Sequence, residues 1–416
     1  MNKIFWILVI MSNQITFGQN LAERLENNHE KYKENSLKTR LFKHKDIVVI
    51  IDKMRKEGNF EIKEIAKSTQ KREIFQIKIG HGKTLVLLWS QMHGDEPTAT
   101  MAMFDLFNFF AQKDEFDELR KNILDNCTLY FVPMLNPDGA EVWKRRTALD
   151  IDMNRDALRL QTPEGRLLKS LQNNLKPVFG FNLHDQAPRY SVGETGNQTA
   201  ISFLATAYDH ERNINQVRKQ SMQLIVNMNK TLQKFIPNKV GRYSDEHEPR
   251  AFGDNIQKWG TSLILIESGG YKNDPEKMYL RKMNFLAILM GLNSIADESY
   301  QKEEISNYNL IPENGQAIYD LIIKNVWVQK QGQKVKMDLA INRLEEVDST
   351  FTKFVTKGIV EELGDLSIFH GIEEIYAEGM EVVSKEELKH KGKAEFEILE
   401  KGIGKYSIKN GQLIKQ

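Results

Sequence analysis

The sequence contains almost no cysteine: Cys127 is the only one in 416 residues. A single thiol excludes an intramolecular disulfide, so disulfide crosslinks cannot stabilise the fold. A chain of this length can bury a sizeable hydrophobic core, and its length favours two domains. The sequence therefore predicts domains that are held together by packing.

A surplus of charge of either sign is also missing. The 58 lysines and arginines nearly cancel the 57 aspartates and glutamates, which leaves a formal net charge of +1. Proteins that bind nucleic acid or acidic membranes need a basic surplus. We therefore expect no nucleic-acid partner. With 40% hydrophobic and 28% charged residues, the composition is that of an ordered soluble protein.

The N-terminal apolar run is too short to span a bilayer. Residues Ile4–Met11 follow the basic Lys3 and precede the small residues Thr16 and Gly18. Eight apolar residues fall well below the roughly 20 needed for a transmembrane helix. A basic start, an apolar core and a small-x-small pair are typical of a signal peptide, here residues 1–18; a buried first strand or helix is the alternative. We expect an exported protein with no membrane span once mature, and the lack of disulfides favours a bacterial periplasm or exterior.

The rest of the chain divides into three regions by its patterning. A charged segment with helical periodicity covers residues 19–58. Residues 59–300 then alternate between apolar strand-like runs and helical stretches, which predicts an α/β fold with a mixed, mostly parallel central sheet and flanking helices. The expected strands are 60–65, 73–79, 84–90, 127–133, 177–183, 200–207 and 262–266, and the expected helices are 98–112, 211–235 and 275–296. Short strands with Gly and Asn turns over residues 312–416 predict a small all-β domain.

Three reactive side chains follow three of these predicted strands. His93, His184 and Glu267 each stand at the carboxyl end of an apolar run. In α/β sheets ligands bind beyond the carboxyl ends of the strands, so we expect these side chains to meet at one edge. Catalytic zinc takes three protein ligands and keeps a fourth position for water. His93 and Glu96, three residues apart, could supply two ligands and His184 the third.

Each of these signals has an ordinary alternative. A His-x-x-Glu pair can be a solvated helix N-terminus, and a lone His after a strand is often a hydrogen-bonded structural residue. Glu267 could be a helix N-cap or an ion-pair partner instead of the base that takes a proton from water. Between these positions, Arg145, Asn154 and Arg155 carry groups suited to gripping a carboxylate, although surface charge pairing would explain them as well.

Five short blocks in this order resemble the zinc carboxypeptidases of the M14 family over roughly residues 55–298. They are His93-Gly94-Asp95-Glu96, Asn136-Pro137-Asp138-Gly139, Asp152-Met153-Asn154-Arg155-Asp156, Asn182-Leu183-His184 and Glu267. The resemblance implies one Zn²⁺ per chain, held by His93, Glu96 and His184. It also implies that Glu267 acts as general base and then as general acid.

The same resemblance implies the substrate contacts. Asn154 and Arg155 would grip the C-terminal carboxylate of a peptide, and Arg145 would polarise the scissile carbonyl and stabilise the oxyanion. Arg146 is adjacent and could take that role instead. The family usually has a mobile tyrosine before the catalytic glutamate; Tyr243 is the nearest one here, and its alignment is loose. The C-terminal region is more faintly similar to the small β-sandwich that flanks the barrel in amidohydrolases.

The sequence therefore predicts an exported zinc metallocarboxypeptidase that acts on peptides with a free C-terminal carboxylate. Two alternatives remain open: a zinc-dependent deacylase of small N-acyl amino acids, and a non-catalytic protein that binds carboxylates. No oligomeric state or side-chain preference is predicted.

Overall fold

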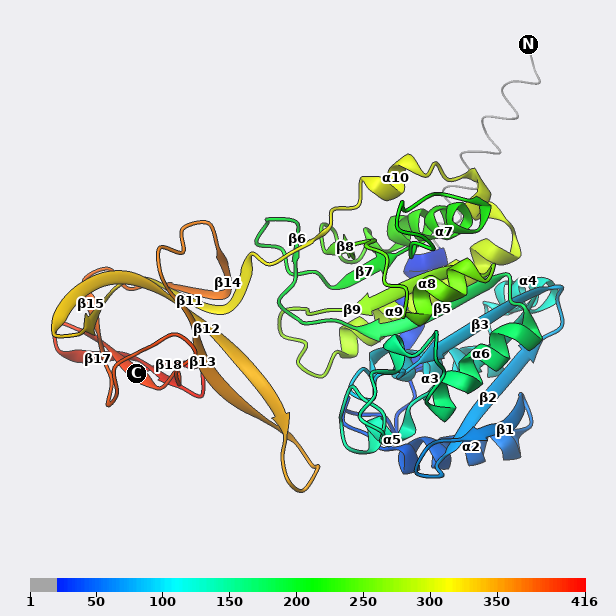
Figure 1. Ribbon diagram of the computed structural model, residues 1–416, viewed down its shortest axis with the longest axis horizontal. Helices are drawn as coiled ribbons and strands as arrows, with labels where there is room; N and C mark the ends of the chain where they lie inside the picture. Colours follow the sequence, from blue (N-terminus) through cyan, green and yellow to red (C-terminus); the bar gives the residue numbers. More distant parts are fainter. Residues whose placement is uncertain (1–20) are drawn as a thin grey trace, which may run out of the picture. The chain divides into compact units, whose positions relative to one another are not determined.

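The computed structural model describes residues 21–416, which divide into two compact units (Figure 1). The first unit comprises the residues up to Gln186 together with Ala200–Glu313, and the second comprises Ala187–Thr199 and Asn314–Gln416. The predicted signal peptide, residues 1–18, lies outside the described residues. Within residues 21–416 no helix is both long and apolar enough to cross a membrane.

The first unit is built on one eight-stranded sheet with the order β1-β2-β4-β3-β5-β9-β7-β8. Its strands are β1 (Glu61–Lys67), β2 (Glu73–Gly80), β3 (Thr84–Ser90), β4 (Cys127–Val132), β5 (Phe179–Asp185), β7 (Ile201–Leu204), β8 (Val240–Arg242) and β9 (Ser262–Ser268). The central strands β4, β3, β5 and β9 are parallel, whereas β1, β2 and β7 pair antiparallel with their neighbours toward the centre. The predicted mixed, mostly parallel α/β fold is thus confirmed.

Helices cover both faces of this sheet (Figure 1). They are α2 (His44–Glu57), α3 (Thr98–Ala111), α4 (Asp117–Asn126), α5 (Pro137–Glu141), α6 (Pro163–Leu175), α7 (Gln216–Leu232), α8 (Phe252–Lys258), α9 (Met278–Ala296) and α10 (Ser306–Asn309), with short 3₁₀ turns at His29–Lys31, Met153–Arg155 and Ser299–Lys302. Strand β3 shows how the layers form. Val86 and Leu88 pack with α3, α7 and α9 on one face, while Leu87 and Trp89 pack with α6 and α8 on the other. A strand buried on both faces therefore has no polar side.

Helices α4 and α6 are the two longest of the helices that were not anticipated from the sequence. Helix α6 carries its own start signal, because the Thr162 hydroxyl accepts a hydrogen bond from the Gly165 N–H and Pro163 occupies the first turn. Helix α4 has Asp117 and Glu118 in its first turn, which suits the positive end of a helix dipole. Both are amphipathic surface helices whose apolar residues are sparse.

The N-terminal segment is not helical throughout, contrary to its periodicity. Residues 21–28 and α2 are helical, but the chain between Tyr32 and Lys43 is irregular. Arg281 of α9 explains the break, because its guanidinium donates to the carbonyl oxygens of Glu34 and Leu37 at 3.0 and 2.8 Å. The Glu34 carbonyl also accepts from the Leu37 N–H at 3.2 Å, which forms a turn and does not continue an α-helix.

A fully buried ion pair fixes this segment to the core. Asp105 of α3 and Arg281 are both 0% exposed. Asp105 also accepts a hydrogen bond from the Glu34 N–H at 2.8 Å and contacts His29 Nε2 at 2.9 Å.

Removing one partner of a buried pair leaves an uncompensated charge, which costs about 3–5 kcal/mol. We expect Asp105→Ala to lower the free energy of unfolding by that amount in urea titrations. Asp125→Ala, which removes an exposed partner of Lys121, is the control and should change little; equal effects of the two variants would contradict the assignment.

The second unit is all-β, as predicted for the C-terminal region. Its sheet has the order β13-β12-β11-β15-β16-β17-β18, with β14 paired to β11, and a separate two-stranded pair joins β10 to β6. The strands are β6 (Ser191–Val192), β10 (Asn314–Gly315), β11 (Ile318–Lys330), β12 (Gln333–Val347), β13 (Phe354–Gly364), β14 (His370–Tyr376), β15 (Met380–Val383), β16 (Phe396–Glu400), β17 (Ile403–Lys409) and β18 (Gln412–Lys415). The resemblance to an amidohydrolase sandwich stays a prediction. Residues 187–199 had no sequence signal that places them in this unit.

Candidate metal centre and active site

The turn after β3 carries His93 and Glu96, and a glycine makes the turn possible. A Cβ atom on Gly94 would lie only 2.0 Å from the carbonyl carbon of Gly139, so no side chain fits there. The Asn136-Pro137-Asp138-Gly139 turn packs against this site, and the Asn136 N–H donates to the Gln91 carbonyl at 2.9 Å. Two of the blocks that carry the family resemblance therefore pack directly against each other.

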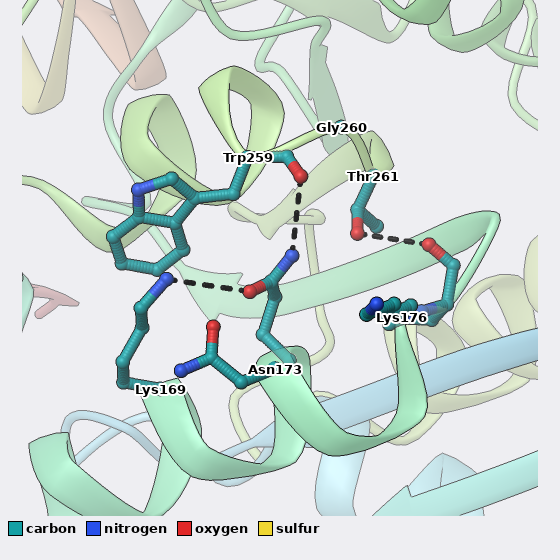
Figure 2. A pocket seen from close by; sticks show the side chains of 8 residues that line it. Lys169, Asn173, Lys176, Trp259, Gly260 and Thr261 are labelled. Atoms are coloured by element: carbon teal, nitrogen blue, oxygen red, sulfur yellow. Dashed lines mark hydrogen bonds between the residues drawn. The ribbon is translucent and has the colours of Figure 1, made fainter.

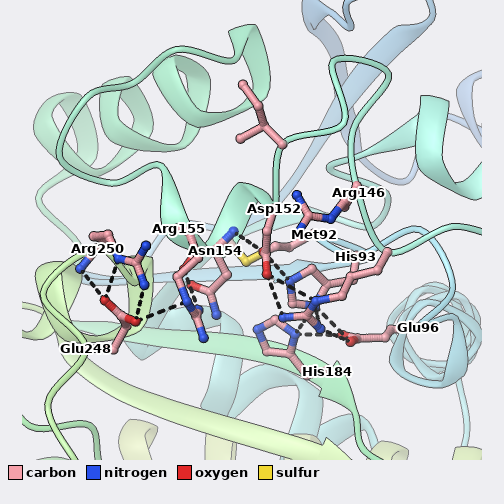
Figure 3. Close-up of polar contacts among 12 residues, drawn as sticks. Met92, His93, Glu96, Arg146, Asp152, Asn154, Arg155, His184, Glu248 and Arg250 are labelled. Atoms are coloured by element: carbon pink, nitrogen blue, oxygen red, sulfur yellow. Dashed lines mark hydrogen bonds and ion pairs between the residues drawn. The ribbon is translucent and has the colours of Figure 1, made fainter.

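His184 reaches the same point from β5. Its Nδ1 lies 2.7 Å from Glu96 Oε2 and 3.2 Å from His93 Nδ1, while His93 Nδ1 lies 2.8 Å from Glu96 Oε1 (Figure 3). Candidate ligand atoms of the three residues all lie within 4.8 Å of one another, and no other such group of three occurs within residues 21–416. In a tetrahedral zinc site with bonds of about 2.0–2.1 Å, two ligand atoms lie about 3.3 Å apart. The nitrogen pair matches that spacing, so the donor set fits a zinc ion.

The electrostatics of the cluster also suit a cation. Burial alone would lower the pKa of the His93 imidazole, but the carboxylates of Glu96 and Asp152 raise this pKa to about 9. Burial alone would likewise raise the pKa of Glu96, yet His93 and His184 hold it below its ordinary value. Burial lowers the pKa of His184. Two imidazole nitrogens that face one carboxylate in a buried space form a site that a divalent cation can satisfy.

Asp152 supports this arrangement and was not singled out from the sequence. Its Oδ1 lies 3.1 Å from His93 Nε2, and its Oδ2 accepts a hydrogen bond from Arg145 Nε at 3.2 Å. A carboxylate on the outer ring nitrogen fixes the tautomer in which Nδ1 is free to bind a metal. The signal was present, because Asp152 stands in one of the resemblance blocks, but spacing alone does not show which histidine it contacts. His184 has no such support, since its Nε2 lacks a hydrogen-bond partner within the described residues.

We expect Asp152→Asn to weaken zinc binding by about 10–100-fold, the usual effect of losing an outer carboxylate partner. The measurement is a competition titration with a zinc chelator. Asp150→Asn is the matched control, because Asp150 lies in the same segment and its side chain is 93% exposed. Equal zinc affinities in the two variants would show that Asp152 does not support the site.

Glu267 lies beside the cluster on β9. It pairs in register with His184 of the parallel strand β5, so both side chains leave the sheet on the same face. Both residues lie within their strands, one position before the last residue, and not just beyond the strand ends as the sequence suggested, because the β5–β9 ladder continues to Asp185 and Ser268. Burial and the carboxylates of Glu96 and Asp185 raise the pKa of Glu267 well above its usual range. Its Oε2 has no hydrogen-bond partner in residues 21–416.

The two neighbouring arginines point to different places. Arg145 reaches the cluster, with Nη1 at 3.0 Å from His93 Nδ1 and 3.2 Å from Glu96 Oε1. Arg146 donates instead to the carbonyl oxygen of Asp150 at 2.7 Å and is exposed. The structure therefore brings Arg145, and not Arg146, to the predicted metal ligands.

Asn154 and Arg155 lie in the 3₁₀ turn that follows Asp152 (Figure 3). Asn154 Oδ1 accepts a hydrogen bond from the Phe252 N–H at 2.9 Å, and Arg155 Nε lies 3.2 Å from Glu248 Oε2. Tyr243 follows β8, where its N–H donates to the Phe203 carbonyl at 2.9 Å. Tyr243 is therefore the first residue of the irregular segment that leads from β8 to Glu248.

A cavity of about 370 Å³ lies elsewhere in the first unit (Figure 2). Its lining includes Lys169, Trp259 and Thr261, and the Lys169 ammonium lies 3.1 Å from the centre of the Trp259 ring. Thr261 directly precedes β9, at the opposite end of that strand from Glu267. The cavity is therefore separate from the cluster of ionisable residues.

Part of this chain is similar to known carboxypeptidases. Residues 47–183 match the family model described as zinc carboxypeptidase. Carboxypeptidase SOL1 of Arabidopsis thaliana is 30% identical over 106 residues, 23% of this chain and 22% of that protein. Probable carboxypeptidase 2 of Arthroderma benhamiae is 27% identical over 135 residues, 32% of this chain and 24% of that protein. The chain thus spans less than a quarter of the length of these curated relatives.

A solved structure shows the same fold. A metallo-carboxypeptidase from Burkholderia cenocepacia superposes with a TM-score of 0.51 and 14% identity, over 62% of this chain and 70% of the other. The matched segment, residues 47–183, contains His93, Glu96 and the 145–155 region and ends one residue before His184. Residues 47–183 of this chain are therefore similar to the zinc carboxypeptidases, and the first unit has the fold of a solved metallo-carboxypeptidase.

Proposed function

We propose that this protein is a zinc-dependent metallocarboxypeptidase that hydrolyses the C-terminal peptide bond of its substrates. The observation that carries the proposal is the convergence of His93, Glu96 and His184 at the ends of two strands, with the partly buried Glu267 paired to His184 on the neighbouring strand. Zinc bound by the three ligands would polarise the scissile carbonyl and acidify a water molecule. Residues of the chain itself transfer the protons and bind the substrate.

Glu267 acts as the base and then as the acid. Its unpartnered Oε2 accepts a proton from the attacking water as the hydroxyl adds to the carbonyl carbon. The same oxygen returns that proton to the amide nitrogen as the C–N bond breaks, so the free amino acid leaves as an amine. A raised pKa suits both steps, because the carboxyl group then holds the proton between them.

The arginines and Asn154 bind the substrate. Arg145, next to His93 and Glu96, donates hydrogen bonds to the oxyanion that forms on the carbonyl oxygen. Asn154 and Arg155 hold the C-terminal carboxylate and so fix which bond is cleaved. The export predicted from residues 1–18 belongs to the same proposal.

A series of substrates of increasing length tests the substrate class. We expect N-acyl dipeptides, tripeptides and tetrapeptides with a free C-terminal carboxylate to lose their last residue. Hydrolysis confined to single N-acyl amino acids would favour the deacylase alternative. Stoichiometric zinc binding without hydrolysis of any of them would favour the non-catalytic carboxylate-binding alternative.

A further inference from the structure

An internal carboxylate already contacts the arginine assigned to the substrate. Glu248 lies between two guanidinium groups, those of Arg155 and Arg250 (Figure 3). Arg155 and Glu248 are both only partly exposed, with 38% and 29% of their side-chain surfaces accessible. A substrate carboxylate that approaches Arg155 therefore meets a group of the same chemistry and the same charge.

The two arginines hold Glu248 unequally. Arg250 donates to it through Nε at 2.9 Å and Nη2 at 2.8 Å, one bond to each carboxylate oxygen, and its backbone N–H donates a third bond at 3.1 Å. Arg155 makes a single ion-pair contact through Nε at 3.2 Å. Hydrogen bonds from Arg250, together with the charges of Arg155 and Arg250, hold the pKa of Glu248 at about 2. Glu248 is therefore a permanent anion whose weaker contact is the one to Arg155.

We propose that Glu248 competes with the C-terminal carboxylate of the substrate for Arg155, and that substrate binding exchanges one carboxylate for the other. This inference rests on the proposed function, which gives Arg155 its substrate. After the exchange Glu248 keeps its two-pronged bond to Arg250, so no charge is left without a partner. Glu248 thereby sets the affinity for the carboxylate and not the rate of bond cleavage.

The backbone around Glu248 is fixed, so the exchange needs only side-chain movement. The Glu248 N–H donates to Asp254 Oδ1 at 3.0 Å, and the Arg250 carbonyl accepts from the Ala157 N–H at 3.1 Å. The Phe252 N–H donates to Asn154, the residue next to Arg155. These bonds hold the segment in place while the Arg155 guanidinium turns from one partner to the other.

Glu248→Gln keeps the shape of the side chain and removes the competing charge. When an internal group occupies a binding site, the apparent dissociation constant of the ligand equals its intrinsic value divided by the fraction of sites that are free. Because the lost contact is a partly exposed ion pair, we expect KM for peptides with a free carboxylate to fall about three- to fivefold with kcat unchanged. Glu246→Gln is the matched control, because Glu246 is an exposed carboxylate of the same segment, and its KM should equal that of the wild type.

Arg250→Gln should change KM in the opposite direction. Without Arg250, Glu248 depends on Arg155 alone, so KM should rise, and the double variant with Glu248→Gln should recover a KM at or below the wild-type value. If Glu248 instead positions Arg155 for the substrate, Glu248→Gln will leave KM unchanged or raise it, which overturns the inference while hydrolysis by the wild type upholds the proposed function. A wild-type protein that cleaves no carboxylate-terminated peptide overturns both.

Discussion

Replacing Glu267 by glutamine is expected to lower kcat by about 10²–10⁴-fold while the protein keeps its zinc. The amide has nearly the same size as the carboxyl group but cannot accept the proton of the attacking water. Glu267 is not one of the three predicted ligands, and its Oε2 has no partner within residues 21–416, so its loss removes a proton carrier and leaves the donor set unchanged. The measurement is kcat on a carboxylate-terminated peptide, together with the zinc content of the purified protein.

Glu164→Gln is the matched control for this variant. Glu164 is 0% exposed, and burial raises its pKa, but it lies on α6 and accepts a hydrogen bond from the Thr69 N–H. We expect this variant to keep the wild-type kcat. A Glu267→Gln protein that binds zinc and cleaves at the wild-type rate would contradict the assigned role of Glu267.

Replacing His184 by alanine should remove both zinc and activity. His184 supplies one of the three donors and spans the gap between the β5 strand and the turn after β3. Loss of an outer partner already costs about 10–100-fold in affinity, so loss of a ligand should cost more than about 100-fold. Zinc content measured after dialysis against a weak chelator should fall from one ion per chain to near zero, and kcat/KM should fall with it.

The control for this variant is His44→Ala. His44 is also buried, but its Nε2 lies 2.9 Å from the backbone carbonyl oxygen of Glu73, outside the cluster. This variant should keep one zinc ion per chain. Retention of zinc by His184→Ala would exclude His184 as a ligand.

The positions of His93, His184 and Glu267 could be predicted from the sequence because they depend on strand ends. An apolar run of five or more residues defines a buried strand, and parallel neighbours place their carboxyl ends at one edge. Three such runs were therefore enough to predict that His184 and Glu267 lie near His93, although they follow it by 91 and 174 residues in the sequence. The structure adds the register, with His184 opposite Glu267.

The contacts of Asp152 and Glu248 could not be predicted in the same way. Both lie in irregular segments, where no periodicity fixes the direction of a side chain. Asp152 meets His93 across 59 residues, and Glu248 meets Arg155 across 93. The irregular stretch before α2 was missed for a related reason, since its carbonyls are bound by Arg281, more than 240 residues away in sequence.

The most direct test of the account follows a peptide by mass spectrometry with the purified, full-length protein. The substrate is supplied as the free acid and as the C-terminal amide, with and without a zinc chelator. The account predicts that the free acid loses one residue from its C-terminus, that the amide stays intact, that the chelator stops the reaction and that added zinc restores it. Equal cleavage of the amide, cleavage within the peptide, or full activity in the presence of the chelator would contradict it.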